Sequence, residues 1–150
     1  LMNIGISYPD QSAERKILNL SNEKNNASPK NVLSSNELLD IQTFVKEIPV
    51  GESVVQYILN IIKQSRPETS EVKSVKENIL WGPSPRASLA LMTTCRAKAF
   101  LENRYSPSVF DVQSLVKPVL SHRLKLSISA KAENVNIEEI LDDVINHTKN

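Results

Sequence analysis

The sequence has few cysteine, glycine and aromatic residues, and each scarcity argues against certain folds or kinds of site. A single cysteine, Cys95, rules out a disulfide framework or a cysteine-rich metal site within one chain. Its place in an apolar helical pattern predicts a small buried side chain rather than a nucleophile. The 3 glycines and 8 prolines favour helices punctuated by proline over a β-sandwich. Aromatic residues make up only 5% of the chain, so few side chains could stack on nucleic-acid bases.

The sequence also lacks an excess of charge of one sign and any long apolar run. The 18 Lys+Arg residues nearly balance the 17 Asp+Glu residues, whereas general binders of nucleic acid or membrane surfaces usually carry a clear basic excess. Because no run reaches about 18 apolar residues, we expect no transmembrane helix. A lone cysteine fits a reducing compartment, and we expect a cytoplasmic protein.

The first ten residues, LMNIGISYPD, have neither the basic region nor the long apolar region of a signal peptide. Met2, Ile4 and Ile6 alternate with polar or small residues, as in an extended strand. A natural chain seldom begins with an exposed half-strand. We therefore expect that residue 1 is not the true beginning of the protein.

Several motifs that carry chemistry are absent. The sequence has no GxxxxGK[ST], no GxGxxG, no HExxH and no paired CxxC. Its two histidines, His122 and His147, lie far apart in the sequence. This argues against a serine, cysteine or metal hydrolase built from this chain alone, and we expect no metal site.

Apolar spacing and turn residues predict about six helices. Apolar side chains recur every three to four residues in each of these segments, and polar or charged stretches at 21–34 and 67–78 separate them as loops. The predicted helices cover residues 10–20, 35–48, 51–66, 84–103, 106–124 and 134–150. Alternation within 124–130 predicts a short strand that pairs with 78–82. The predicted fold class is mainly α, a helical bundle with a small β-ribbon.

Residue types at the predicted helix ends agree with this division. The candidate N-caps, whose side chains can accept from first-turn N–H groups, are Asp10, Ser35 or Asn36, Ser84 and Ser106. Pro85 and Pro107 follow two of them at the position where a missing N–H costs nothing. Pro118 is expected to kink or break the fifth helix near Lys117. The fourth helix is rich in Ala and Leu, so we expect it to be central and mostly buried.

Arg86 is out of keeping with ordinary helix rules. The segment WGPSPRASLALM places this arginine in the first turn of the fourth helix, where the helix dipole favours anions and mildly disfavours cations. One interpretation is a surface arginine, or one paired with a glutamate of a neighbouring helix. The other is that the guanidinium and the free N–H groups of the helix start face an anion together, an arrangement that suits a phosphate.

Other charged residues have simpler interpretations. His122-Arg123 could act as a switch or a phosphate contact, but such a pair at a helix end more often caps its carbonyl groups. Arg66, at the end of the third helix, invites the same interpretation. The carboxylates of IEEILDDVI are spaced to lie on one solvated face, without the geometry of a metal site.

From residue 82 onward the sequence resembles the C-terminal lid region of MoxR-type AAA+ ATPases, in the run GPSPRASLALMTTCRAKAFLENRYSPSVFDVQSLVKPVLSHRLKLS. The matching positions are Gly82, Ser84, Pro85, Arg86, Ala87, Ser88, Leu89, Tyr105, Pro107, Asp111, Val112, Val119, Leu120, His122, Arg123 and Leu124. The earlier part agrees through Tyr8, Pro9, Glu14, Ile17, Leu18 and Arg66. Departures are Ser7 in place of Gly, Pro83 in place of Ala and Ser65 in place of Thr, with longer polar loops around 22–30 and 68–78.

The resemblance implies a helical bundle of the AAA+ lid type and a role for Arg86. It implies that residues 1–9 are the junction from a missing ATPase core and that 10–150 are the lid. Arg86 would be the sensor-2 arginine, which reaches the γ-phosphate of ATP held by the core. Tyr8, Pro9 and Ile17 would lie near the adenine, and the hinge would lie near Ser7-Tyr8-Pro9.

The resemblance also implies partners and an activity for the whole protein. Walker A and B motifs would lie upstream of residue 1 and hold ATP with Mg²⁺, so the chain alone should fold without hydrolysing ATP. The parent would be a chaperone-like remodeller, often a hexameric ring, that works with von Willebrand factor A domain proteins. Methanol dehydrogenase regulators belong to this family. The alternative is a stand-alone helical module that binds protein or DNA, with 106–127 taken as a recognition helix.

Overall fold

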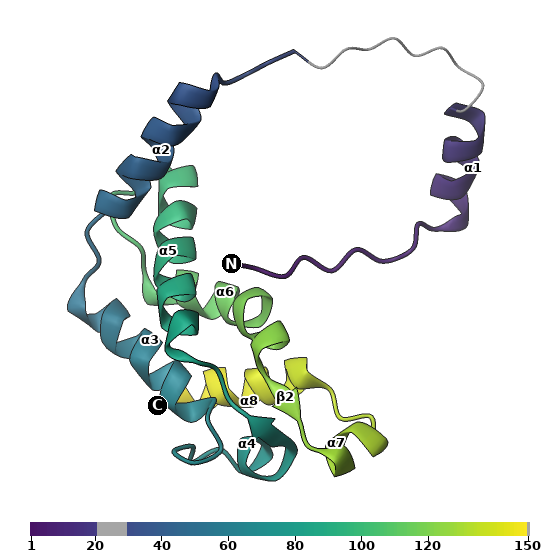
Figure 1. The fold of residues 1–150 in the computed structure, drawn as a ribbon, viewed down its shortest axis with the longest axis vertical. Coiled ribbons are helices and arrows are strands. Elements are labelled where there is room, and N and C mark those ends of the chain that lie inside the picture. The colour runs from purple at the N-terminus through teal and green to yellow at the C-terminus, as the bar shows by residue number, and fades with distance from the viewer. Residues whose placement is uncertain (21–29, 150) are drawn as a thin grey trace.

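The computed structural model describes residues 1–20 and 30–149, and within them the chain is mainly helical (Figure 1). The elements, in chain order, are α1 (Gln11–Leu20), α2 (Ser35–Glu47), α3 (Glu52–Gln64), α4 (Lys73–Asn78), β1 (Ile79–Trp81), α5 (Pro85–Leu101), α6 (Val109–Leu120), the 3₁₀ turn η1 (Ser121–Arg123), β2 (Lys125–Leu126), α7 (Ile128–Ala132) and α8 (Ile137–Thr148). The mainly α prediction is confirmed. Most of the predicted loop 21–34 lies outside the described residues.

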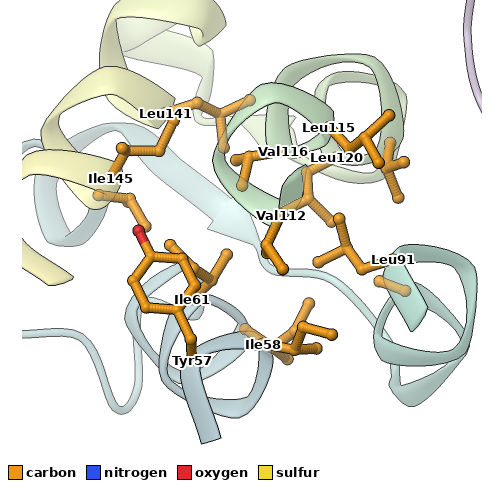
Figure 2. Close-up of a cluster of buried hydrophobic side chains, with 14 of the residues drawn as sticks. Tyr57, Ile58, Ile61, Leu91, Val112, Leu115, Val116, Leu120, Leu141 and Ile145 are labelled. Atoms are coloured by element: carbon orange, nitrogen blue, oxygen red, sulfur yellow. The ribbon is translucent and has the colours of Figure 1, made fainter. Parts of the chain in front are cut away.

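Four helices enclose the core. Figure 2 shows Tyr57, Ile58 and Ile61 of α3 meeting side chains of α5, α6 and α8. The largest fully buried side chains include Ile61, Leu91, Leu120 and Leu141. Burying each of these contributes about 1.5–3 kcal/mol relative to exposure. This packing fixes the direction of α5, because its buried stripe packs against α3 and α6.

Helix α5 is central, as predicted, but its buried stripe consists mainly of small residues. The buried positions are Ala87, Ala90, Leu91, Thr94, Cys95 and Ala99. Leu89 of the same helix is 68% exposed. The small side chains allow close approach of neighbouring helices, and Leu91 is the large apolar residue on this inner face.

The predicted β-ribbon is present and short. β1 pairs antiparallel with β2, with Ile79 opposite Leu126 and Trp81 opposite Lys125. The ribbon joins the turn before α5 to the segment after α6. The prediction of a strand over 124–130 was too long, because α7 begins at Ile128 after Ser127, whose hydroxyl accepts from the N–H of Ala130.

Three sequence predictions were wrong, one that concerned a loop and two that concerned helix caps. Residues 73–78 form α4 rather than a loop, since Val75 is buried against the core. The second and fifth helices are capped by Ser34 and Ser108, each in a capping box with the acidic residue three positions later. These boxes displace Ser35, Asn36 and Ser106 from the cap position.

Pro118 does not break α6, which continues to Leu120. A proline inside a helix costs about 3 kcal/mol. Val119 and Leu120 are fully buried, and their burial offsets a cost of that size. The last turn is also held by Arg123, whose Nε donates to the carbonyl of Val119 at 2.9 Å.

The N-terminal arm and α1 stand apart from the bundle. Figure 1 shows α1 well separated from α5 and α6, and none of its residues is buried. Asp10 caps α1 as predicted, since its carboxylate accepts from the N–H of Ala13 at 2.7 Å. The arm is tied to the bundle where the N–H of Asn3 donates to the carbonyl of Pro118 at 2.7 Å.

Candidate functional site at the start of helix α5

The turn Gly82–Pro85 delivers Arg86 to the first turn of α5. Ser84 occupies the N-cap position and Pro85 the first helical position, as predicted. The side chain of Ser84 makes no capping hydrogen bond, whereas its carbonyl accepts from the N–H of Ala87 at 2.9 Å. Ala87 is fully buried. The helix start is thus anchored by its backbone and by the residue that follows Arg86.

Arg86 itself is exposed and unpaired. No described residue forms an ion pair or a hydrogen bond with its side chain. Pairing with a neighbouring glutamate is therefore excluded among residues 1–20 and 30–149, whereas a surface arginine and an anion-facing arginine both fit this exposure. A free guanidinium beside the N-terminal end of a 17-residue helix is suited to an anion.

Arg66 reaches the same turn from the end of α3. Its Nε donates to the carbonyl of Pro83 at 3.0 Å, so it does not cap the carbonyls of its own helix as the sequence suggested. The backbone of Gly82 lies against Arg66: a Cβ at Gly82 would stand 2.8 Å from the Arg66 Cα. Only a residue without a side chain fits here. Gly82 is therefore required for the turn to approach α3.

A shallow cavity of about 380 Å³ lies beside this turn. Arg66, Trp81 and Pro85 contribute to its wall, and Trp81 is 67% exposed. Lys125 of β2 places its ammonium 6.0 Å from the centre of the Trp81 ring. Arg66 thus contacts the turn before α5 directly, and Lys125 lies over Trp81, the residue that precedes this turn.

The remaining predicted site residues lie elsewhere. Tyr8 is 96% exposed and Ile17 is 57% exposed, and Pro9 is exposed between them. Figure 1 shows their segment far from the start of α5. The structure therefore does not bring these three residues together with Arg86.

The residues at the end of α6 serve the helix end. The interpretation of Arg123 as a cap is confirmed by its bond to the Val119 carbonyl, and its Nη2 also donates to the carbonyl of Leu1 at 3.3 Å. His122 is exposed. Burial of its ring and the neighbouring Arg123 charge lower the pKa of His122.

The other titratable groups agree with a structural role. Cys95 is fully buried, and burial, followed by the charge of Asp111, raises the pKa of its thiol to about 12. Asp142 pairs with Lys117 at 2.8 Å on the surface of α8. In the described part of the chain, no group of three or more His, Cys, Asp or Glu could hold a metal ion.

An ion-pair cluster between the end of α5 and the start of α6 was not predicted from the sequence. Arg104 donates from both terminal nitrogens to the carboxylate of Asp111, at 2.8 Å each, and the N–H of Ser108 donates to the same carboxylate at 2.7 Å. Asn103, with φ of 55°, ends α5 so that Arg104 can turn back. The signal was the spacing Ser108-x-x-Asp111, which marks a capping box.

Comparisons with known proteins agree with this geometry. Residues 72–144 match the family model described as AAA lid domain. The chain is 30% identical to Chaperone MoxR1 of Mycobacterium tuberculosis over 97% of its own length and 38% of that protein. It is 27% identical to the uncharacterized protein YeaC of Bacillus subtilis, covering 99% of this chain and 44% of that protein. The chain thus spans less than half of these curated relatives.

A solved structure shows the same fold. The crystal structure of a candidate ATPase from Cytophaga hutchinsonii superposes with a TM-score of 0.87 at 26% identity, over 97% of this chain and 44% of that one. The chain therefore contains an AAA+ lid domain. Within that class it belongs to the MoxR family. None of the helices in the described ranges is both long and apolar enough to cross a membrane.

Proposed function

We propose that this chain is the sensor-2 portion of a MoxR-type AAA+ ATPase and that Arg86 contacts the γ-phosphate of ATP. The observation that carries the proposal is the exposed, unpaired guanidinium of Arg86 at the start of α5, held by a turn that is itself anchored. An arginine fork suits a phosphate because it can donate two parallel hydrogen bonds. The family relationship supports the same assignment.

The chemistry assigned to Arg86 is charge stabilisation. When ATP transfers its γ-phosphoryl group to water, negative charge spreads over the phosphoryl oxygens, and a fixed cation stabilises that charge. Loss of the phosphate would release the lid and allow it to rotate as a rigid body. The residues of this site are cationic, so we assign Mg²⁺ to carboxylates and hydroxyls of the ATPase core, outside this chain.

The division of the chain follows from the same proposal. Residues 1–9 would be the junction to the core, and 10–150 the lid. Tyr8, Pro9 and Ile17 would contact the adenine of ATP bound by the core. They would not need to lie near the start of α5. Their exposure supports this, because large apolar side chains such as Ile6 and Tyr8, which are more than 90% exposed, need a covering surface.

The activity of the whole protein extends the proposal. We propose that it hydrolyses ATP in the cytoplasm, assembles as a ring, typically a hexamer, and remodels or matures protein complexes as a chaperone. The name of the Mycobacterium tuberculosis relative, a chaperone, supports this. Partners with von Willebrand factor A domains are proposed on family resemblance alone.

The decisive experiment measures steady-state ATP turnover of the complete protein. Arg86→Ala should lower kcat by about 100-fold, the effect of removing one well-placed electrostatic donor. Arg86→Lys keeps the charge but loses the fork, so it should recover only part of this loss. The control is Lys131→Ala, which removes an exposed cation of α7. Turnover of Arg86→Ala equal to that of the control would remove the assignment.

The alternative of a stand-alone interaction module gains no support from α6. Its apolar face is buried, from Val112 through Leu120. Its basic residue Lys117 pairs with Asp142, and Arg123 caps the helix end. No structural observation therefore favours nucleic-acid binding over the lid function.

A further inference from the structure

We infer that Arg66 is a positioning residue for Arg86, acting through the turn Gly82–Pro85 that precedes α5. This inference rests on the proposed function of Arg86 and adds a second arginine to its mechanism. Arg66 lies 20 positions earlier in the sequence, on a different helix end. The structure joins the two through one hydrogen bond and one close backbone contact.

The hydrogen bond fixes the carbonyl of Pro83. Pro83 is buried and has no N–H of its own, so its carbonyl is the one backbone group of this residue that needs a partner. The Nε of Arg66 donates to it at 3.0 Å. Because the guanidinium is planar and rigid, this bond sets the orientation of the Pro83 peptide rather than only its position.

The backbone contact fixes Gly82. The position of a Cβ on Gly82 would be 2.8 Å from the Cα and the Cγ of Arg66 and 2.9 Å from the carbonyl oxygen of Ser65. The turn therefore rests directly on the backbone at the end of α3. The residues that follow, Pro83, Ser84 and Pro85, include two prolines with restricted φ, so little freedom remains between this contact and Arg86.

Hydrogen bonds fix the position of Arg66 relative to the core of the bundle. Its N–H donates to the carbonyl of Lys63 at 3.2 Å, and its carbonyl accepts from Thr69 and Ser70 at 3.1 and 2.8 Å. The preceding Ser65 is fully buried, and its hydroxyl donates to Ile61 at 2.7 Å. The chain around Arg66 is thus continuous with the core of the bundle.

These contacts form one mechanical path from the core to the exposed guanidinium. Arg66 follows the C-cap of α3 and is bonded to that helix through the carbonyl of Lys63. Arg66 orients the Pro83 carbonyl, and the proline-rich turn then directs the first residues of α5. Ala87, fully buried, anchors the other side of Arg86. Arg86 is therefore exposed but held on both sides, which a group that must meet a phosphate at a fixed position requires.

The test is a kinetic double-variant cycle in the complete protein, with ATP as the varied substrate. Arg66→Met should lower kcat about tenfold with KM changed less than about twofold, because the loss is in alignment at the transition state. In the Arg86→Ala background, Arg66→Met should cause no further loss. Arg66→Lys, which keeps a donor and the charge, should recover part of kcat.

Gly82→Ala perturbs the same contact between Arg66 and the turn, with the change made in the turn. Its Cβ must push the turn away from Arg66, so it should reproduce the kcat loss of Arg66→Met and should also add nothing to Arg86→Ala. Lys63→Met is the matched control: it removes an exposed cation from the same helix end without touching the turn. It should leave kcat and KM unchanged.

Hydrogen exchange measured by mass spectrometry separates local loosening from unfolding. Arg66→Met and Gly82→Ala should speed exchange in the peptide 82–92 while peptides of α6 and α8 keep their protection. Faster exchange throughout the bundle would assign Arg66 a general structural role and overturn the inference.

The kinetic outcomes distinguish the inference from the function it rests on. If Arg86→Ala leaves turnover unchanged, the proposed function fails. If Arg86→Ala lowers turnover but Arg66→Met and Gly82→Ala do not, only the positioning role fails. A further tenfold loss on adding Arg66→Met to Arg86→Ala would mean that Arg66 acts on the nucleotide independently, which also overturns the inference.

Discussion

Replacing Asp111 with asparagine should lower the free energy of unfolding of the lid by about 3 kcal/mol. The side chain of Asp111 is only 4% exposed. It accepts two hydrogen bonds from Arg104 and two from Ser108, and the Lys98 ammonium lies 3.4 Å away. The cluster joins the loop after α5 to the start of α6, so its loss should weaken the contact between two core helices.

The magnitude follows from burial and from what asparagine retains. Removing one member of a buried ion pair costs about 3–5 kcal/mol. Asparagine keeps the volume and one acceptor for the Ser108 cap, and the Arg104 side chain, 34% exposed, can regain water. We therefore expect the lower end of the range. For a domain of this size that corresponds to a fall in Tm of about 6–12 °C.

The assay is urea and thermal unfolding of chain 1–150, followed by circular dichroism. Asp142→Asn is the matched control, because Asp142 is also ion-paired at 2.8 Å but 51% exposed, and surface pairs contribute about 0–1 kcal/mol. Equal stability of the two variants would refute the reasoning that the burial of Asp111 makes its pair matter.

The same experiment has a pH dependence with a defined sign. Burial raises the pKa of Asp111, but hydrogen bonds from Arg104 and Ser108 outweigh it and hold the pKa below its ordinary value of 3.8. A carboxyl with a depressed folded-state pKa stabilises the fold above its unfolded pKa and loses that contribution as the pH falls. The difference between wild type and Asp111→Asn should shrink as the pH drops from about 6 to about 3.

Three further predictions concern the core, the thiol and the nucleotide. Leu91→Ala, at a fully buried position, should cost about 3 kcal/mol in urea unfolding, whereas Leu89→Ala, 68% exposed on the same helix, should cost less than about 0.5 kcal/mol; equal losses would contradict the assigned core face. Cys95, with its pKa raised to about 12, should react with a thiol reagent only as the chain unfolds, and labelling of the native chain within seconds would show that the thiol is accessible. Chain 1–150 should bind ATP more weakly than about 100 μM by calorimetry, since most phosphate contacts would come from the core, and micromolar binding would mean that the nucleotide site is misplaced.

The sequence predicted those parts of the fold whose signals are local. Ser84 and Pro85 marked the start of α5 because a cap residue followed by proline is a backbone preference that needs no tertiary contact. The pairing of 78–82 with 124–130 was correct in its partners, although the second strand covers only Lys125–Leu126. The caps at Ser34 and Ser108 were also available from the sequence, through Glu37 and Asp111, and were missed.

The remaining features depend on tertiary packing. α4 has six residues, two of them lysines, and forms because Val75 is buried against the core rather than by propensity. Pro118 continues α6 because the residues after it are buried. At the candidate site, the sequence identified Arg86 but not its support, since contacts between residues 66 and 82–83 cannot be inferred from spacing.

The close packing of α5 has a consequence for how motion would be amplified. Its 17 residues span about 25 Å, and the small buried residues Ala87, Ala90 and Ala99 let neighbouring helices approach it closely. At its C-terminal end Phe100 packs against Phe44 of α2, with ring centres 5.7 Å apart and the ring planes tilted by 59°. The helix would therefore move as a rigid body that links Arg86 to the Phe44–Phe100 contact. A rotation of about 10° at its first turn would carry the Phe44–Phe100 end through roughly 4 Å.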